Sequence, residues 1–160
     1  DQGKEFDFIM AAPQCPDGKY WSTENWFDSL YDEVTSNYRI DKSRVYVTGI
    51  SMGGYGTYVA ALDHSEKIAA IVPLCGGIND SDTTRICRLK DIPILTYHGT
   101  ADDEISIHET ERKAESLKKC NGNIIFHRLT GKGHGIQYLY ETELWIYEWL
   151  LMQRNTKSNK

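Results

Sequence analysis

Short hydrophobic runs alternate along this chain with longer segments whose apolar residues recur at helical spacing. The runs have the length of buried strands, and they fall at residues 6–12, 44–48, 68–74, 92–97 and 124–129. The helical spacing predicts helices over 22–38, after residue 51, over 107–119 and around 144–150. Ser22 or Thr23 is expected to cap the first of these helices. Strands that alternate with helices are typical of a mostly parallel sheet with helices on both faces, so we expect an α/β fold with about five strands.

The chain has 160 residues, which is the length of one domain. A chain of this size buries roughly 70% of the surface that it exposes when unfolded, which is enough for a hydrophobic core. We expect a single truncated domain over residues 1–153 and a frayed polar tail over residues 154–160.

The net charge of −5 and the absence of a basic stripe argue against nucleic acid as a partner. The longest apolar run is too short to cross a bilayer, and no signal-peptide pattern is found, so we expect no membrane partner. The cysteines Cys15, Cys75, Cys87 and Cys120 form no C-x-x-C pair, which argues against a zinc or thioredoxin-type site. Cys75 and Cys87 flank a loop and could form a disulfide, or all four cysteines could remain thiols.

Residues 49–54 read Gly-Ile-Ser-Met-Gly-Gly and directly follow an apolar strand. The frame G-x-S-x-G between a strand and a helix is the nucleophile elbow. We expect a turn so tight that both Gly49 and Gly53 must lack side chains. At its strained apex, Ser51 would point its hydroxyl out of the sheet, where a substrate carbonyl could reach it.

A serine hydroxyl is a weak nucleophile, and it needs a neighbouring base that a carboxylate orients. His134 is the best candidate base, because it lies in a glycine-rich loop after the last predicted strand. The acid should follow the fourth predicted strand, where Asp102, Asp103 and Glu104 are adjacent. Spacing from the strand end favours Asp102, with Asp103 as the alternative. His98, which closes that strand, is expected to hydrogen-bond to backbone.

Two other interpretations of the acidic segment are open. The three acids could form a solvated turn, or they could bind a cation together with His98. A metal site is not favoured, because no second histidine cluster supports it. Residues 131–133 lack the frame of a phosphate-binding loop, so nucleotide binding is not expected either. The chemistry of a serine nucleophile requires no cofactor.

The chain resembles the α/β-hydrolase superfamily, and within it the serine esterases related to feruloyl esterases, acetyl xylan esterases, polyhydroxybutyrate depolymerases and predicted peptidases. The resemblance is carried by residues 12–16, 41–56, 72–77, 98–102 and 131–134. It implies that Ser51 is the nucleophile, Asp102 the acid and His134 the general base. It also implies that the backbone N–H of Met52 is an oxyanion donor.

The resemblance further implies that Gln14 and Trp21 lie near the mouth of the substrate pocket, although both could equally be packing residues. Trp21, Trp26 and Tyr55 could stack on a phenolic ring or a sugar, or they could belong to the core, which we favour for Trp26. Feruloyl or acetyl esters of plant polysaccharides are the substrates that the resemblance suggests. An extracellular or periplasmic location goes with them.

Relatives of this type have three further strands ahead of the one expected at 6–12, and a loop among them supplies a second oxyanion donor. We expect both to be absent from this chain, and the loss of one such donor typically costs about 10²–10³ in turnover. The missing third strand would lie between the strands expected at 6–12 and 44–48. The chain could be a shortened form of a longer hydrolase, a second chain or protomer could complete the sheet, or the two strands could pair directly. The alternatives to an active esterase are a catalytically weak or inactive binding module and a serine peptidase.

Overall fold

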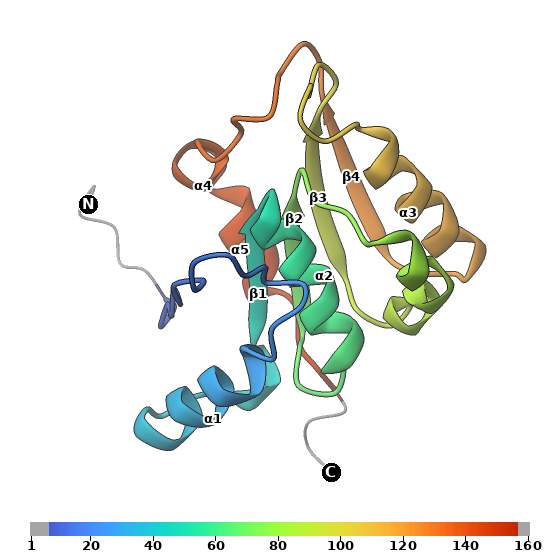
Figure 1. The fold of residues 1–160 in the computed structure, drawn as a ribbon. Helices are drawn as coiled ribbons and strands as arrows, with labels where there is room; N and C mark the ends of the chain where they lie inside the picture. The colour runs from blue at the N-terminus through green and yellow to red at the C-terminus, as the bar shows by residue number, and fades with distance from the viewer. Residues whose placement is uncertain (1–6, 157–160) are drawn as a thin grey trace.

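The structure, a computed structural model, describes residues 7–156, apart from the side chains of residues 80–84. Its centre is a sheet of four strands in the order β1-β2-β3-β4 (Figure 1). The strands are β1 (Tyr46–Ile50), β2 (Ala70–Leu74), β3 (Ile94–Gly99) and β4 (Ile124–Leu129). All three pairings are parallel, which confirms the predicted α/β class.

Helices cover both faces of this sheet, as the pattern predicted. The helices are α1 (Phe27–Asn37), α2 (Met52–Asp63), α3 (His108–Lys119), α4 (Leu139–Thr142) and α5 (Trp145–Leu151), with short 3-10 helices η1 (Lys42–Arg44) and η2 (Asp80–Leu89). Figure 1 shows α2 in front of the sheet and α5 behind it. Among the described residues, no helix combines the length and the apolar character needed to cross a membrane.

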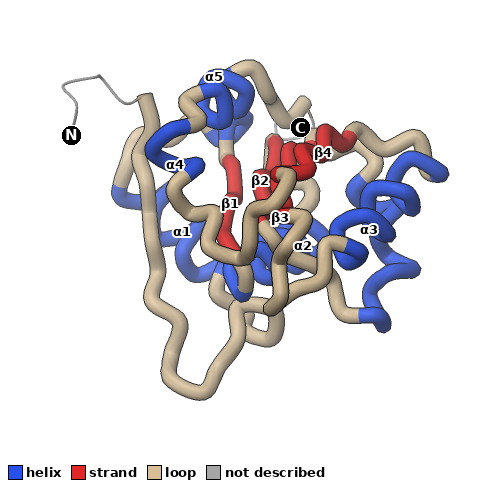
Figure 2. Tube along the Cα trace, turned by 90° about the horizontal axis from the view of Figure 1, so that it is seen from above, coloured by secondary structure: helices blue, strands red, loops and turns tan. Residues whose placement is uncertain are grey.

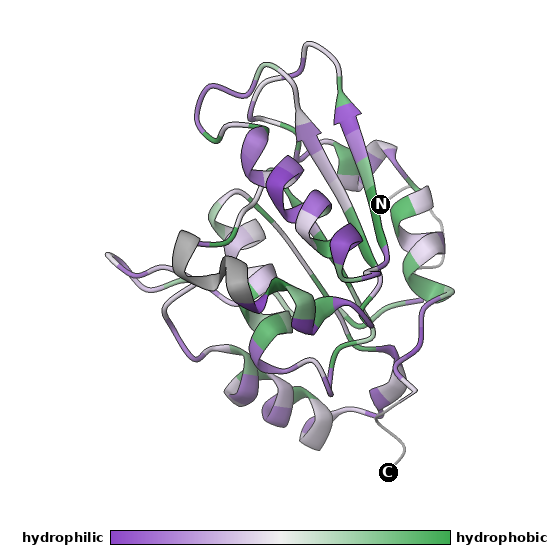
Figure 3. Cartoon of the chain, turned by 90° about the vertical axis from the view of Figure 1, so that its right-hand side faces the viewer, coloured by the Kyte–Doolittle hydropathy of each residue, from purple (hydrophilic) through white to green (hydrophobic). Residues whose placement is uncertain are grey.

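Alternating side chains of the strands divide the core into two layers. Ile71 and Ile94 belong to one cluster, which includes apolar residues of α1, α2 and α3. Val72 and Leu95 belong to the other, which includes apolar residues of α4 and α5. Residues of β2 and β3 are buried throughout, because these central strands are covered on both faces. The outer surface of α3 is largely hydrophilic (Figure 3).

The strand predicted at residues 6–12 is not present in the described part of that segment. Residues 7–12 are irregular, and residue 6 lies outside the described residues. Ile9 and Met10 are 58% and 79% exposed, so the apolar run is not buried. Phe8 makes edge contacts with the rings of Tyr46 and Tyr147, which hold the segment beside β1 without ladder hydrogen bonds. A buried strand needs a hydrogen-bonding partner, and no described strand pairs with this one. Within residues 7–156 the sheet therefore has four strands rather than five.

The start of the first helix and the start of the polar tail also differ from the prediction. Helix α1 begins at Phe27 without a side-chain cap, because Thr23 donates its hydroxyl to Tyr20 O in a preceding turn instead. The polar tail is ordered further than residue 153: Asn155 is only 7% exposed, and its Nδ2 donates to the carbonyl oxygens of Glu66 and Ile68 at 2.8 and 3.1 Å.

The disulfide joins Cys87 in η2 to Cys120 at the end of α3, so the pairing of Cys75 with Cys87 was wrong. Cys75 and Cys15 are buried thiols. The fold brings together two cysteines that are 33 residues apart in the sequence. Sequence spacing alone could not identify this pair.

Reducing the Cys87–Cys120 bond should lower the free energy of unfolding by about 3–4 kcal/mol, since the open loop regains conformational entropy in the unfolded state. Urea unfolding of the oxidised and reduced protein measures the difference. A Cys15→Ser variant is the control, and reductant should destabilise it by the same amount as the wild type. A Cys87→Ser/Cys120→Ser variant as stable as the oxidised protein would contradict the prediction.

Candidate active site

The three residues that the sequence singled out for chemistry lie at one edge of the sheet. Ser51 follows β1, Asp102 lies in the loop after β3, and His134 lies in the loop after β4. Because all strands are parallel, their carboxyl ends meet at this edge, which Figure 2 shows from above with loops covering it. This is the edge at which open α/β sheets bind their ligands.

The turn at Ser51 has the strained backbone expected of an elbow. Ser51 has φ 56° and ψ −117°, a conformation that residues with side chains rarely adopt. Its N–H donates to Leu74 O at the end of β2, which anchors the turn to the neighbouring strand. Met52 directly follows as the first residue of α2, so its backbone N–H belongs to the unpaired donors of a helix N-terminus. Such donors stabilise negative charge.

Only the first glycine of the elbow is required for steric reasons. A Cβ on Gly49 would lie 2.5 Å from the carbonyl carbon of Gly53, a severe overlap with backbone. A Cβ on Gly53 would meet nothing within 4 Å. The expectation that both positions must lack a side chain is therefore wrong for Gly53.

A matched pair of substitutions tests this asymmetry. Gly49→Ala should lower the free energy of unfolding by about 1–3 kcal/mol or more, because the backbone must move to relieve the overlap. Gly53→Ala should leave stability unchanged or raise it by up to about 1 kcal/mol, because alanine favours the helix. Denaturant unfolding measures both, and equal losses in the two variants would contradict the assignment.

Asp102 and His134 form the central contact of the site. His134 Nδ1 lies 2.9 Å from Asp102 Oδ2, and the side chain of Asp102 is fully buried. The other carboxylate oxygen, Oδ1, accepts hydrogen bonds from the backbone N–H groups of Glu104 and Ile105 at 3.0 and 2.9 Å. Asp103 is exposed. The structure therefore places Asp102, rather than Asp103, against the histidine.

These bonds keep the Asp102 carboxylate ionised. Burial raises its pKa, but the hydrogen bonds from Ile105, His134 and Glu104 outweigh burial and hold the pKa below its usual value. A lowered folded-state pKa means that the carboxylate stabilises the fold above the ordinary aspartate value of about 3.9. This contribution is lost as the pH falls through the lowered pKa.

Cys75, which follows β2, lies beneath the site. Its thiol is buried and donates to His134 O at 3.4 Å, and it lies near the backbone N–H of Ser51. Burial raises the pKa of this thiol to about 12 against the smaller opposing effect of the Ser51 amide, so it stays protonated at neutral pH. Cys75, Asp102 and His134 offer possible metal-ligating atoms within 4.8 Å of one another. These groups already contact one another, since Asp102 lies 2.9 Å from His134 Nδ1 and the Cys75 thiol donates to His134 O.

The three residues expected to bind substrate lie as follows. Gln14 is exposed, and its Nε2 donates to Cys15 O. Trp21 packs against Gly56 of α2 and makes an edge contact with Trp26. Tyr55 lies over Gly77, where an added Cβ would come within 2.9 Å of the Tyr55 hydroxyl. Their roles in substrate binding stay predictions.

Two features of the site were missed in the sequence. The neighbours of Cys75 are Ser51, Asp102 and His134, and they could not be foreseen because they come from three different loops. His98 bonds to backbone as predicted, at Ile105 O, but its Nε2 also lies 3.1 Å from Asp102 Oδ2. The position of His98 four residues before the acid was the only signal.

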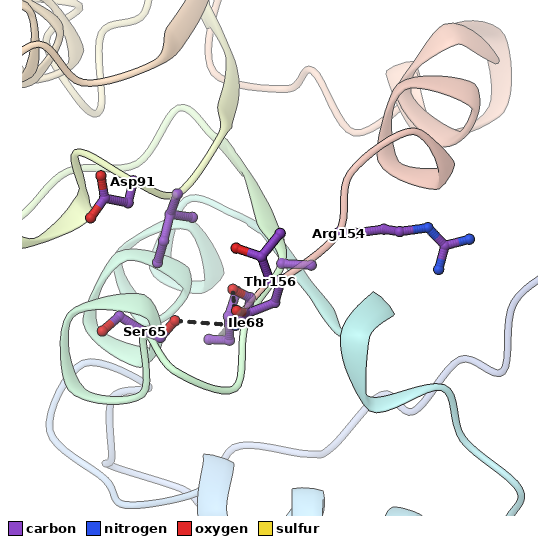
Figure 4. Close-up of a pocket in the computed structure, with 8 residues that line it drawn as sticks. Ser65, Ile68, Asp91, Arg154 and Thr156 are labelled. Carbon is purple, nitrogen blue, oxygen red and sulfur yellow. Dashed lines mark hydrogen bonds between the residues drawn. The ribbon is translucent and has the colours of Figure 1, made fainter. Parts of the chain in front are cut away.

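A cavity of about 320 Å³ lies at the opposite edge of the sheet (Figure 4). It is lined by Ser65, Ile68, Ala69, Asp91, Ile92, Arg154, Asn155 and Thr156. These residues include those that lead into β2 and β3, so the cavity is remote from the carboxyl ends of the strands. The Arg154 side chain points away from it and pairs with Asp41. The cavity marks where the C-terminal segment attaches, not the candidate active site.

Comparisons with known proteins agree with this fold. Residues 22–142 match the family described as phospholipase/carboxylesterase. A bifunctional acetylxylan esterase/xylanase of Neocallimastix patriciarum is 38% identical over 110 residues, which cover 65% of this chain and 16% of that protein. A poly(3-hydroxyalkanoate) depolymerase C of Paucimonas lemoignei is 42% identical over 91 residues, which cover 47% of this chain and 22% of that protein.

Solved structures of other proteins share this fold. The crystal structure of a thermostable esterase superposes with a TM-score of 0.69 at 30% identity, covering 79% of this chain and 35% of that one. Arabidopsis thaliana SOBER1 superposes with a TM-score of 0.62 at 22% identity, covering 78% of this chain and 59% of that one. The chain thus spans less than two thirds of the length of these relatives. With its parallel sheet and the family match across most of its length, the chain belongs to the phospholipase/carboxylesterase family of α/β-hydrolases.

Proposed function

We propose that this chain carries the catalytic residues of a serine esterase. Ser51 is the nucleophile, Asp102 the acid and His134 the base. The observation that carries the proposal is the 2.9 Å contact between His134 Nδ1 and the buried Asp102 carboxylate, at the edge where the strained Ser51 also lies. The carboxylate accepts a hydrogen bond from the Nδ1–H group, which keeps that hydrogen on Nδ1 and leaves the other ring nitrogen, Nε2, free to act as a base. Membership in a carboxylesterase family supports the same chemistry.

The proposed reaction proceeds in two halves. Ser51 Oγ attacks the ester carbonyl carbon while His134 Nε2 takes the hydroxyl proton, and the resulting oxyanion lies at the N-terminus of α2 beside the Met52 amide. The tetrahedral intermediate collapses, the alcohol leaves with the proton from His134, and an acyl-serine remains. Water, deprotonated by His134, then attacks the acyl-serine and releases the carboxylic acid and the free Ser51 hydroxyl.

For the substrate, we propose acetyl esters of plant polysaccharide ahead of feruloyl esters. The relative that matches 65% of this chain is described as an acetylxylan esterase joined to a xylanase. Among the aromatic side chains that could have held a phenolic ring, Trp21 packs against α2 and Trp26, which supports a role in packing. A small acyl group needs no such platform. An extracellular setting fits this substrate and the Cys87–Cys120 disulfide.

A substrate panel tests this proposal. We expect release of acetate from acetylated xylan and hydrolysis of p-nitrophenyl acetate, with slower turnover of methyl ferulate and none of peptide amides. Faster turnover of methyl ferulate than of acetyl esters would overturn the choice of acyl group. Turnover of peptide amides at the rate of esters would instead favour the peptidase.

One observation favours the second candidate, a catalytically weak module. His134 Nε2 lies 3.7 Å from the exposed Glu104 carboxylate, a contact that competes with proton transfer from Ser51. A Glu104→Gln variant distinguishes the two. If Glu104 holds His134 away from Ser51, the substitution should raise ester turnover, whereas an efficient esterase should be unaffected.

A further inference from the structure

We propose that His98 is a positioning residue for Asp102, a role that rests on the proposed esterase function of the same site. His98 lies near the end of β3 and is completely buried. Buried polar side chains are normally hydrogen-bonded, and both ring nitrogens of His98 have partners. Nε2 faces Ile105 O and Asp102, and Nδ1 faces Thr110. The mechanism above does not use this second histidine, yet it touches the same carboxylate as His134.

The Nε2 atom of His98 closes a ring of contacts around the acid. It lies 2.8 Å from Ile105 O and 3.1 Å from Asp102 Oδ2, and both of these atoms are acceptors. Nε2 must therefore carry a hydrogen. The N–H of the same Ile105 donates to Asp102 Oδ1. The carboxylate is thus held by Ile105 on one oxygen, while His98 faces the other oxygen and fixes the carbonyl of Ile105.

The opposite ring nitrogen anchors His98 to the body of the protein. Nδ1 lies 2.8 Å from the hydroxyl of Thr110, a buried residue of α3. That hydroxyl also lies 3.2 Å from Gly76 O, in the loop after β2. Because Thr110 has one hydroxyl hydrogen, it donates to Nδ1 when His98 is neutral and to Gly76 when both ring nitrogens carry hydrogen. In both states His98 connects helix α3 with the loop that carries Asp102.

This arrangement gives each nitrogen of His98 a separate task. Nδ1 holds the ring against Thr110, and Nε2 fixes the direction of the Asp102 carboxylate that orients His134. A rotated carboxylate would weaken the contact with His134 Nδ1, which is needed to keep Nε2 of the base available. The consequence should appear in turnover rather than in substrate binding, since His98 is buried away from the surface.

Two substitutions, each of which replaces one ring nitrogen of His98 by an amide group, separate the contribution of Nε2 from that of Nδ1. In His98→Gln the side-chain amide lies near the former Nε2 position and can still donate toward Ile105 O and Asp102. In His98→Asn the shorter amide lies near the former Nδ1 position and reaches Thr110 only. We expect His98→Asn to lower kcat for p-nitrophenyl acetate at least about 10-fold with KM unchanged. His98→Gln should stay within about 3-fold of the wild type.

Proton NMR of the hydrogen bond between His134 Nδ1 and Asp102 supplies a second readout. Its low-field signal should persist in the wild type and in His98→Gln, and it should be lost or broadened in His98→Asn. This readout needs no turnover, so a wild type that is inactive on esters would overturn the proposed function and still leave His98 tested.

Two outcomes, one kinetic and one spectroscopic, would overturn the positioning role. Equal kcat values in the Gln and Asn variants would show that the donor at Nε2 does not matter, and an unchanged signal in His98→Asn would show the same. If His98→Asn does not fold, Thr110→Val serves instead, because it removes the anchor on the other side of the ring. We expect a several-fold loss of kcat with KM unchanged for that variant, and a wild-type kcat would contradict the proposal.

Discussion

Replacing Ser51 with alanine should abolish ester hydrolysis, with a loss of about 10⁵–10⁶ in kcat, as is typical when a serine nucleophile is removed. The substitution removes only one oxygen from a half-buried side chain at the start of α2. The fold should therefore be retained, with a melting temperature close to that of the wild type. Initial rates on p-nitrophenyl acetate and a thermal unfolding curve measure the two quantities.

The neighbouring thiol supplies the control for this experiment. Cys75 is also nucleophilic in principle, but its raised pKa of about 12 leaves almost no thiolate at neutral pH. Hydrolysis that persists in Ser51→Ala and disappears in Cys75→Ala would contradict the assignment of the nucleophile.

Replacing Asp102 with asparagine should have the next largest effect, a loss of about 10³–10⁴ in kcat. The amide has nearly the shape of the carboxylate, so the loop from 102 to 105 should keep its course. An asparagine can present its NH₂ group to His134 Nδ1, and the ring would then carry its hydrogen on Nε2, where a base needs a lone pair. Steady-state kinetics on p-nitrophenyl acetate measure the loss.

The adjacent acid offers a matched control. Asp103 is exposed, so Asp103→Asn should change kcat by no more than about 2-fold. A large loss in Asp103→Asn together with a small one in Asp102→Asn would reverse the assignment. The same pair separates the effect of one orienting carboxylate from a general change in the charge of this loop.

Much of the fold could be predicted because local pattern decides it. Residues 124–129 form a strand with the predicted bounds, and α3 begins one residue after its predicted start, since length and periodicity suffice for such elements. Ser51, Asp102 and His134 each follow a strand of their own, which placed them at one edge, because parallel strands align their carboxyl ends.

Other features depend on contacts between distant segments. The run at 6–12 has the composition of a strand, but a strand also needs a neighbour with which to bond. The partner of Cys87 is decided by the packing of η2 against α3. The proposed role of His98 depends on a loop that brings Ile105 O back to the His98 ring, and no periodicity in the sequence reveals such a loop.

Peptide mapping by mass spectrometry after treatment with a fluorophosphonate tests the central claim most directly, since this reagent reacts with serines that an adjacent base activates. We expect a single stoichiometric adduct on Ser51 in the native protein, and none in His134→Ala or after unfolding. An unmodified Ser51 in the folded protein, or equal labelling of Ser51 with and without His134, would contradict it.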